Sequence, residues 1–112
     1  MPAKRPQRKP TRSPAKMIAV RNVNVPLYRG RVNAQMYAAM LRALMRVLPA
    51  KPPGLTQAGM FSKVKPHLPG ALFPGGEKVG WWVKTVQLDQ EARRLIVREQ
   101  TTPLRWHRSK RR

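Results

Sequence analysis

The chain has 112 residues, of which 24 are Lys or Arg and four are Asp or Glu, so its formal charge is +20. This length allows a single domain with a modest core, and the lack of cysteine excludes disulfides and thiolate metal sites. No apolar run reaches the roughly 18 residues needed to span a membrane, and we expect a cytoplasmic protein.

The positive charge is concentrated near the two ends of the chain. Residues 1–31 hold nine basic and no acidic residues, and residues 105–112 hold five basic and none. Residues 1–16 are also rich in Pro and poor in large apolar side chains, so they cannot offset the entropy lost on ordering. We predict a disordered basic arm over 1–16, one domain over 17–108 and a basic tail over 109–112. An arm that lies along phosphates is favoured over a tail that only aids solubility.

The first predicted elements are a strand and a helix. Loose alternation of apolar residues over 17–25, ending at Pro26, predicts one short edge strand that could pair with a C-terminal hairpin. Asn33 is a suitable N-cap for a helix over 34–48. Apolar residues at three- and four-residue spacing give this helix its core face: Tyr37, Met40, Leu41, Leu44 and Leu48.

A second, shorter helix should start at Thr56, whose hydroxyl can accept from free N–H groups of the first turn. Gly59 replaces the Glu of a capping box and weakens this turn. Pro66 and Pro69 are expected to end the helix.

The clearest helical pattern follows the turn at 73–76, whose two glycines permit positive φ. It predicts a third helix over 77–94. The buried face is formed by Val79, Trp82, Val83, Val86 and Gln90. The opposite arc is too mixed to be a simple solvated surface, so we expect it to touch another part of the fold or a partner: Trp81, Lys84, Gln87, Leu88 and Glu91. Trp82 should lie in the core and Trp81 at its rim, where packing is favoured over stacking on a base.

Two β-rich runs, 95–99 and 104–108, flank a polar turn that contains Pro103 and predict a hairpin. A helix that leads into a terminal hairpin is typical of the third helix and wing of a winged helix-turn-helix. The fold class expected is therefore α+β, with three helices, a C-terminal hairpin and a short N-terminal strand. The run 89–96, DQEARRLI, resembles the third-helix exit of winged-helix regulators, although Gln90 replaces an apolar residue and Arg94 replaces the usual Gly.

The residues with catalytic or metal-binding potential form no recognisable constellation. His67 and His107 lie in separate segments, and the four carboxylates lack metal-ligand spacing. The run Gly75-Gly76-Glu77-Lys78 lacks the spacing of a nucleotide-binding loop. We expect no enzymatic activity, no metal and no cofactor.

Four motifs in this order, GLTQAGM, LFPGG, GWWVKTVQLD and PLRWHR, resemble a family of small bacterial proteins of unknown function. The resemblance covers about residues 20–108, with Gly59 and Gln90 as local departures. It implies one compact, winged-helix-like unit in a bacterial cytoplasm and implies no activity.

Charge and element order together favour nucleic-acid binding, with double-stranded DNA preferred over RNA. A transcriptional regulator or nucleoid-associated protein would use the third helix, the wing and both tails. Lys84 and Gln87 could reach base edges. It is equally compatible with the sequence that both side chains are ordinary solvated helix surface and contact no base. The predicted contact residues are Lys78, Lys84, Gln87, Arg94, Arg98, Arg105, Arg108, Lys4, Arg5, Arg8, Lys9, Lys110, Arg111 and Arg112. An RNA- or ribosome-associated protein and a protein-interaction module remain alternatives, and a homodimer is compatible with the sequence.

Overall fold

The computed structural model describes residues 15–110 and shows an α+β fold with three helices and a C-terminal hairpin, as predicted. Most of the predicted arm, residues 1–14, and the end of the predicted tail, residues 111–112, lie outside the described part. The main elements are β1 (Met17–Val20), β2 (Gly30–Asn33), α1 (Ala34–Val47), β3 (Leu55–Thr56), α2 (Gln57–Val64), α3 (Val79–Ala92), β4 (Ile96–Glu99) and β5 (Arg105–Arg108). Two short 3-10 turns, η3 (Lys65–His67) and η4 (Pro74–Gly76), lie between α2 and α3.

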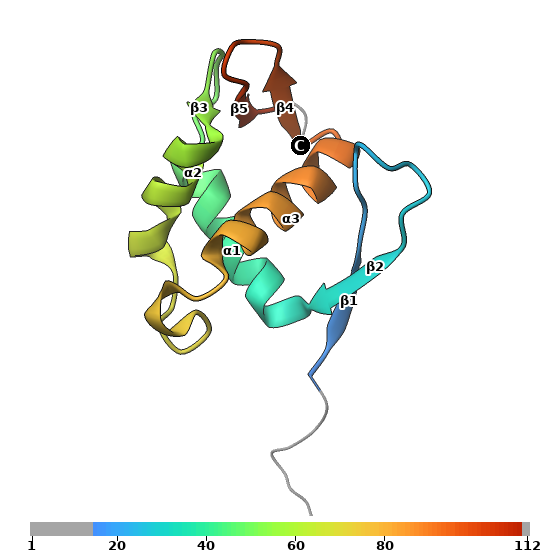
Figure 1. The fold of residues 1–112 in the computed structure, drawn as a ribbon, viewed down its shortest axis with the longest axis vertical. Helices are drawn as coiled ribbons and strands as arrows, with labels where there is room; N and C mark the ends of the chain where they lie inside the picture. Colours follow the sequence, from blue (N-terminus) through green and yellow to red (C-terminus); the bar gives the residue numbers. More distant parts are fainter. Residues whose placement is uncertain (1–14, 111–112) are drawn as a thin grey trace, which may run out of the picture.

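Helix α3 runs through the middle of the molecule (Figure 1), with α1 and α2 packed against it and the β1–β2 hairpin along its other flank. The apolar residues with no exposed surface come from all three helices: Met40, Leu44, Met60, Val64, Val83 and Val86. Trp82 is buried and Trp81 is 54% exposed, which confirms the predicted division between core and rim.

Polar caps fix the starts of the first two helices. The Asn33 side chain accepts from the backbone N–H of Met36 at 2.9 Å, and Thr56 Oγ1 accepts from that of Gly59 at 3.1 Å. Both predicted N-caps are confirmed. The turn before α3 also has the predicted positive φ, 64° at Gly75 and 73° at Gly76.

A three-stranded antiparallel sheet has the order β3-β5-β4, so the strand between α1 and α2 pairs with the last strand of the chain. Leu55 lies opposite Trp106. Just before this pair, Gly54 has φ +94°, and a Cβ there would overlap the carbonyl oxygen of Trp106. Only glycine allows this close backbone approach.

The N-terminal region differs from the prediction in two ways. The strand β1 ends at Val20, because residues 23–28 form turns closed by bonds such as Val25 N–H to the Asn22 carbonyl. It pairs with β2, with Met17 opposite Asn33, so the suggested pairing with the C-terminal hairpin is wrong. The partner strand Gly30–Asn33 is short and polar, and only Val32 in it is buried. It therefore lacks the alternation by which strands are predicted.

Helix α3 ends two residues earlier than predicted, at a left-handed residue. Arg94 has φ +66°. Its N–H bonds the Glu91 carbonyl at 3.0 Å, and the next N–H, from Leu95, bonds the Gln90 carbonyl at 2.9 Å. These two bonds are those of a Schellman motif, in which glycine usually occupies the position held here by Arg94.

Candidate nucleic-acid interface

Asp89 is the first of three carboxylates that the fold uses internally. It has no exposed surface, and its oxygens accept from the Arg21 backbone N–H at 2.7 Å and from Arg93 Nε at 2.9 and 3.0 Å. The Tyr37 hydroxyl donates to it as well, and Gln90 Nε2 donates to that hydroxyl at 2.7 Å. Burial, followed by the hydrogen bond to Asp89, raises the pKa of Tyr37 well above its ordinary 10.0. This network joins the β1–β2 hairpin to α1 and α3.

Glu91 is the second internal carboxylate. It forms an ion pair with Arg98, whose Nε lies 2.9 Å from Glu91 Oε1. Glu91 Oε2 accepts from Arg98 Nη2 at 3.0 Å and from Gln87 Nε2 at 3.1 Å. Gln87 is only 1% exposed. The prediction that Gln87 lies on an exposed arc and reaches base edges is therefore wrong, because its amide is used to hold Glu91. The mixed arc does touch the rest of the fold, since Leu88 and Glu91 are buried too.

The third carboxylate, Glu99, lies 2.7 Å from His107 Nε2 across the β4–β5 pair. The other ring nitrogen of His107 lies 2.9 Å from the Arg108 carbonyl oxygen. The ring thus bridges the Glu99 side chain and the Arg108 backbone. Between residues 15 and 110, no group of three His, Asp or Glu side chains could hold a metal ion.

Because these acids are paired, nearly all the exposed charged residues are positive. In the described part of the chain, Glu77 is the one carboxylate residue classed as exposed. The exposed cations are Lys16, Arg21, Arg29, Arg31, Arg42, Arg46, Lys51, Lys63, Lys65, Lys78, Lys84, Arg93, Arg94, Arg108 and Lys110. Such a surface attracts polyanions without regard to their sequence.

The hairpin arginines of the prediction are partly engaged within the protein. Arg98 holds Glu91 and stacks 5.7 Å from the centre of the Trp106 ring. Arg105 donates to the Gly54 carbonyl at 3.0 Å, and Arg108 Nε donates to the Leu48 carbonyl at 3.0 Å. Arg98 and Arg105 are half-buried, whereas Arg108 is exposed.

Among the other predicted contact residues, Lys78, Lys84, Arg94 and Lys110 are exposed. Lys78 lies just before α3 with φ 60°, and Lys84 lies within the helix. Arg94 lies at the far end of α3, so these side chains are spread along the helix and not gathered at one point. The terminal residues Lys4, Arg5, Arg8, Lys9, Arg111 and Arg112 lie outside the described residues.

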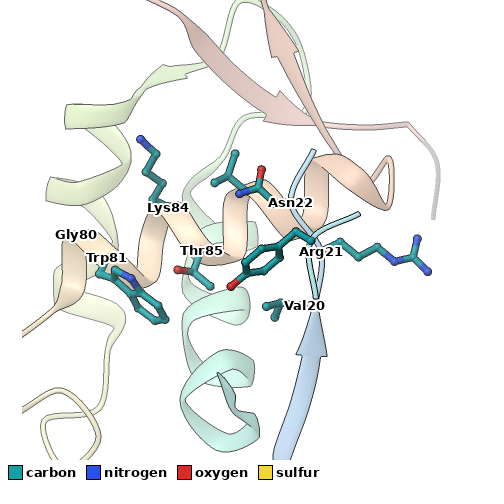
Figure 2. Close-up of a pocket in the computed structure, with 9 residues that line it drawn as sticks. Val20, Arg21, Asn22, Gly80, Trp81, Lys84 and Thr85 are labelled. Atoms are coloured by element: carbon teal, nitrogen blue, oxygen red, sulfur yellow. The ribbon is translucent and has the colours of Figure 1, made fainter. Parts of the chain in front are cut away.

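The exposed edge of α3 borders a groove, shown in Figure 2, whose opposite wall is the segment that follows β1. The groove has a volume of about 430 Å³. Trp81, Lys84 and Thr85 line it from α3, and Asn22 and Tyr28 line it from the other wall. In Figure 2 Arg21 extends away from α3, so only its stem borders this groove.

A second hollow, of about 700 Å³, lies on the N-terminal hairpin and is lined by Arg21, Arg29, Arg31 and Arg93. Arg31 lies in β2 opposite Ala19 of β1, and Arg29 lies just before that strand. This cluster was not predicted from the sequence. The Arg-x-Arg spacing gave no signal for it, because β2 was not predicted and Arg29 lies outside that strand.

None of the helices between residues 15 and 110 has both the length and the apolarity that crossing a membrane requires. Neither the curated proteins nor the solved structures include a match to this chain. A protein-family model described as a family of unknown function, DUF6958, matches residues 17–106. The chain belongs to this family of unknown function.

Proposed function

We propose that this protein binds nucleic acid, with double-stranded DNA as its preferred target, and acts as a transcriptional regulator or nucleoid-associated protein in a bacterial cytoplasm. One observation carries the proposal: three of the four carboxylates are paired internally, which leaves the described surface almost wholly cationic. Neutralising phosphates with these cations releases condensed counterions and so favours binding.

The order of the elements supports duplex DNA as the target. The chain runs α1, β3, α2, α3, β4, β5, and β3 pairs with β5 at the edge of the hairpin. We compare this order with that of winged helix-turn-helix domains, in which the third helix lies toward the major groove and the hairpin toward the backbone, and the likeness supports the proposal. In this protein only the N-terminal half of α3 offers exposed side chains for that purpose, namely Trp81 and Lys84.

The interface we propose therefore differs from the one predicted by sequence. It keeps Lys78, Lys84, Arg94, Arg108 and Lys110, together with the two basic termini. It loses Gln87, which is buried. It gains the hairpin cluster of Arg21, Arg29 and Arg31, which are exposed.

The test measures binding of the full chain to a paired DNA duplex and to a paired RNA duplex of the same length over a salt series. The variant K78Q/K84Q removes two charges beside the exposed edge of α3. The control K63Q/R42Q removes the same charge from α2 and α1. We expect DNA affinity to fall at least about tenfold in the first variant and clearly less in the control. Equal losses of affinity in the two variants would show that the lysines beside α3 contribute no more to binding than other surface cations. Tighter binding to the RNA duplex than to the DNA duplex would show that RNA is the preferred target.

A further inference from the structure

The groove beside α3 combines two exposed aromatic rings with a cation, a combination not explained by contacts to phosphates. Trp81 and Tyr28 are 54% and 43% exposed and come from opposite walls. Both rings border the same groove, so their exposed faces are available to one ligand. Aromatic rings interleaved with cations are the features by which proteins hold unpaired bases.

The local fold places these rings with little freedom. Trp81 is adjacent to Trp82 and packs edge-on against it, with ring centres 5.1 Å apart and planes at 87°. The buried partner thus fixes an indole that remains half open to solvent. The Tyr28 ring lies directly against Gly30, and a Cβ at that glycine would overlap the phenol ring. The Arg21 N–H bond to Asp89 anchors the start of this wall to α3 itself.

The remaining lining suits the edges and the phosphate of one nucleotide. The groove is also lined by the polar side chains of Thr85 and Asn22 and by buried Val20 and Leu88. Lys84 precedes Thr85 in α3 and also lines the groove, and its side chain extends away from Trp81 and Thr85 (Figure 2). No carboxylate is among the described residues that line the groove. A volume of about 430 Å³ falls within the usual range for small-molecule sites and accommodates a single base.

We propose that this groove binds one unpaired nucleobase, stacked between Trp81 and Tyr28, with Lys84 next to its phosphate. The inference rests on the proposed function and narrows it: the preferred DNA carries an extrahelical or unpaired base where it meets α3. Thr85 and Asn22 supply a hydroxyl and an amide that can bond a base edge. Stacking of this kind tolerates any base, so the site selects for unpairing more than for sequence.

The experiment compares three DNA duplexes that share one paired sequence. The first is fully paired, the second carries one extra thymine as a bulge, and the third carries an abasic bulge that keeps the phosphate and lacks the base. Binding of the full chain is measured at one salt concentration, with tryptophan fluorescence as a second readout. We expect the thymine bulge to bind about 5- to 150-fold more tightly than the paired duplex, and the abasic bulge to lose this gain.

Protein variants test whether the preference for the thymine bulge arises from the groove. W81A and Y28A should each remove most of the preference for the thymine bulge over the paired duplex, whereas W81F should keep part of it. Y28A should also leave paired-duplex binding nearly unchanged, because Tyr28 lies outside the interface proposed for paired DNA. The matched control is F61A, since Phe61 is also exposed but has Lys65 Nζ 4.0 Å above its ring and does not line the groove. Thermal unfolding of each variant checks that the domain is folded.

The outcomes separate this inference from the proposed function. If the wild-type chain binds paired and bulged duplexes equally, or prefers the abasic bulge as strongly as the thymine bulge, the stacking site is overturned while nucleic-acid binding stands. A preference that survives in both W81A and Y28A also overturns it. If no DNA binds at all, the proposed function fails with it. The two wild-type comparisons decide the question even if a variant does not fold.

Discussion

The carboxylate of Asp89 accepts a hydrogen bond from the Tyr37 hydroxyl and so joins α3 to α1 inside the core. The same carboxylate holds the Arg21 N–H and the Arg93 side chain. Replacing Asp89 with Asn keeps the size of the side chain but removes the charge and places an N–H₂ group among donors. We expect D89N to lower the free energy of unfolding by about 2–4 kcal/mol in urea denaturation.

The control for this variant is E77Q, which removes an exposed carboxylate and should change stability by less than about 0.5 kcal/mol. A change below about 1 kcal/mol in D89N would show that the network does not anchor the hairpin.

Tyr37 gives the network a pH signature. Its pKa is raised in the folded protein, so its neutral form is favoured there, while the unfolded chain ionises near 10.0. The resulting stability is fully present below about pH 10 and is lost as the pH rises from there toward the folded pKa. The chain has two tyrosines, so in Y28F the tyrosinate absorbance at high pH reports on Tyr37 alone. We expect no tyrosinate near pH 10.5 while circular dichroism shows a folded domain. A midpoint near 10 in the folded state would contradict the buried hydrogen bond.

The sequence predicted the helical part of this fold well because its signals are local. Asn33 and Thr56 cap the helices they were expected to cap, and the apolar spacing around Trp82 identified the buried face of α3. The burial of Gln90, which departs from the winged-helix pattern, has a specific cause: its amide donates to Tyr37, 53 residues away. No periodicity argument can reveal a bond of that sequence separation.

The candidate site was predicted less well for the same reason. A helical wheel shows which residues share a face, but not what covers that face. Gln87 was predicted to lie on an exposed arc, yet it is buried and donates to Glu91, which also binds Arg98 from β4. The groove needs β1, β2 and their turn to stand against α3, and β2 has almost no strand signal.

Gly54 permits the pairing of β3 with β5, and its replacement is a second stability test. Gly54 has φ +94°, and the Trp106 carbonyl oxygen lies where a Cβ would be. Ala at this position would therefore have both an unfavourable backbone conformation and a steric overlap. We expect G54A to destabilise the protein by about 2 kcal/mol or more. G70A is the matched control, because a Cβ on Gly70 meets nothing within 4 Å and its φ is not positive. Similar effects of the two substitutions would mean that the β3–β5 contact is not formed.

Arg94 offers a substitution that stabilises. It occupies the left-handed position of the Schellman motif with φ +66°, a conformation that costs residues with a Cβ roughly 1–2 kcal/mol. We expect R94G to raise the free energy of unfolding by about 0.5–1 kcal/mol, since the greater freedom of glycine in the unfolded chain offsets part of the gain. R94A removes the same charge but keeps the strain and should not stabilise. If both variants gain equally, relief of charge repulsion is the cause.

Arg31 and Arg98 are expected to separate binding from stability. Arg98 pairs with buried Glu91, so R98Q leaves a carboxylate without its cation and should cost about 2–3 kcal/mol of stability.

Arg31 is exposed on the hairpin, and no hydrogen bond or ion pair of its side chain is found with any residue in 15–110. R31Q should leave urea denaturation unchanged but lower DNA affinity and reduce the slope of log K against log salt by about 0.9, the value for one lost phosphate contact. An unchanged slope in folded R31Q would remove the hairpin cluster from the interface, because a cation that contacts phosphate must release counterions when it binds.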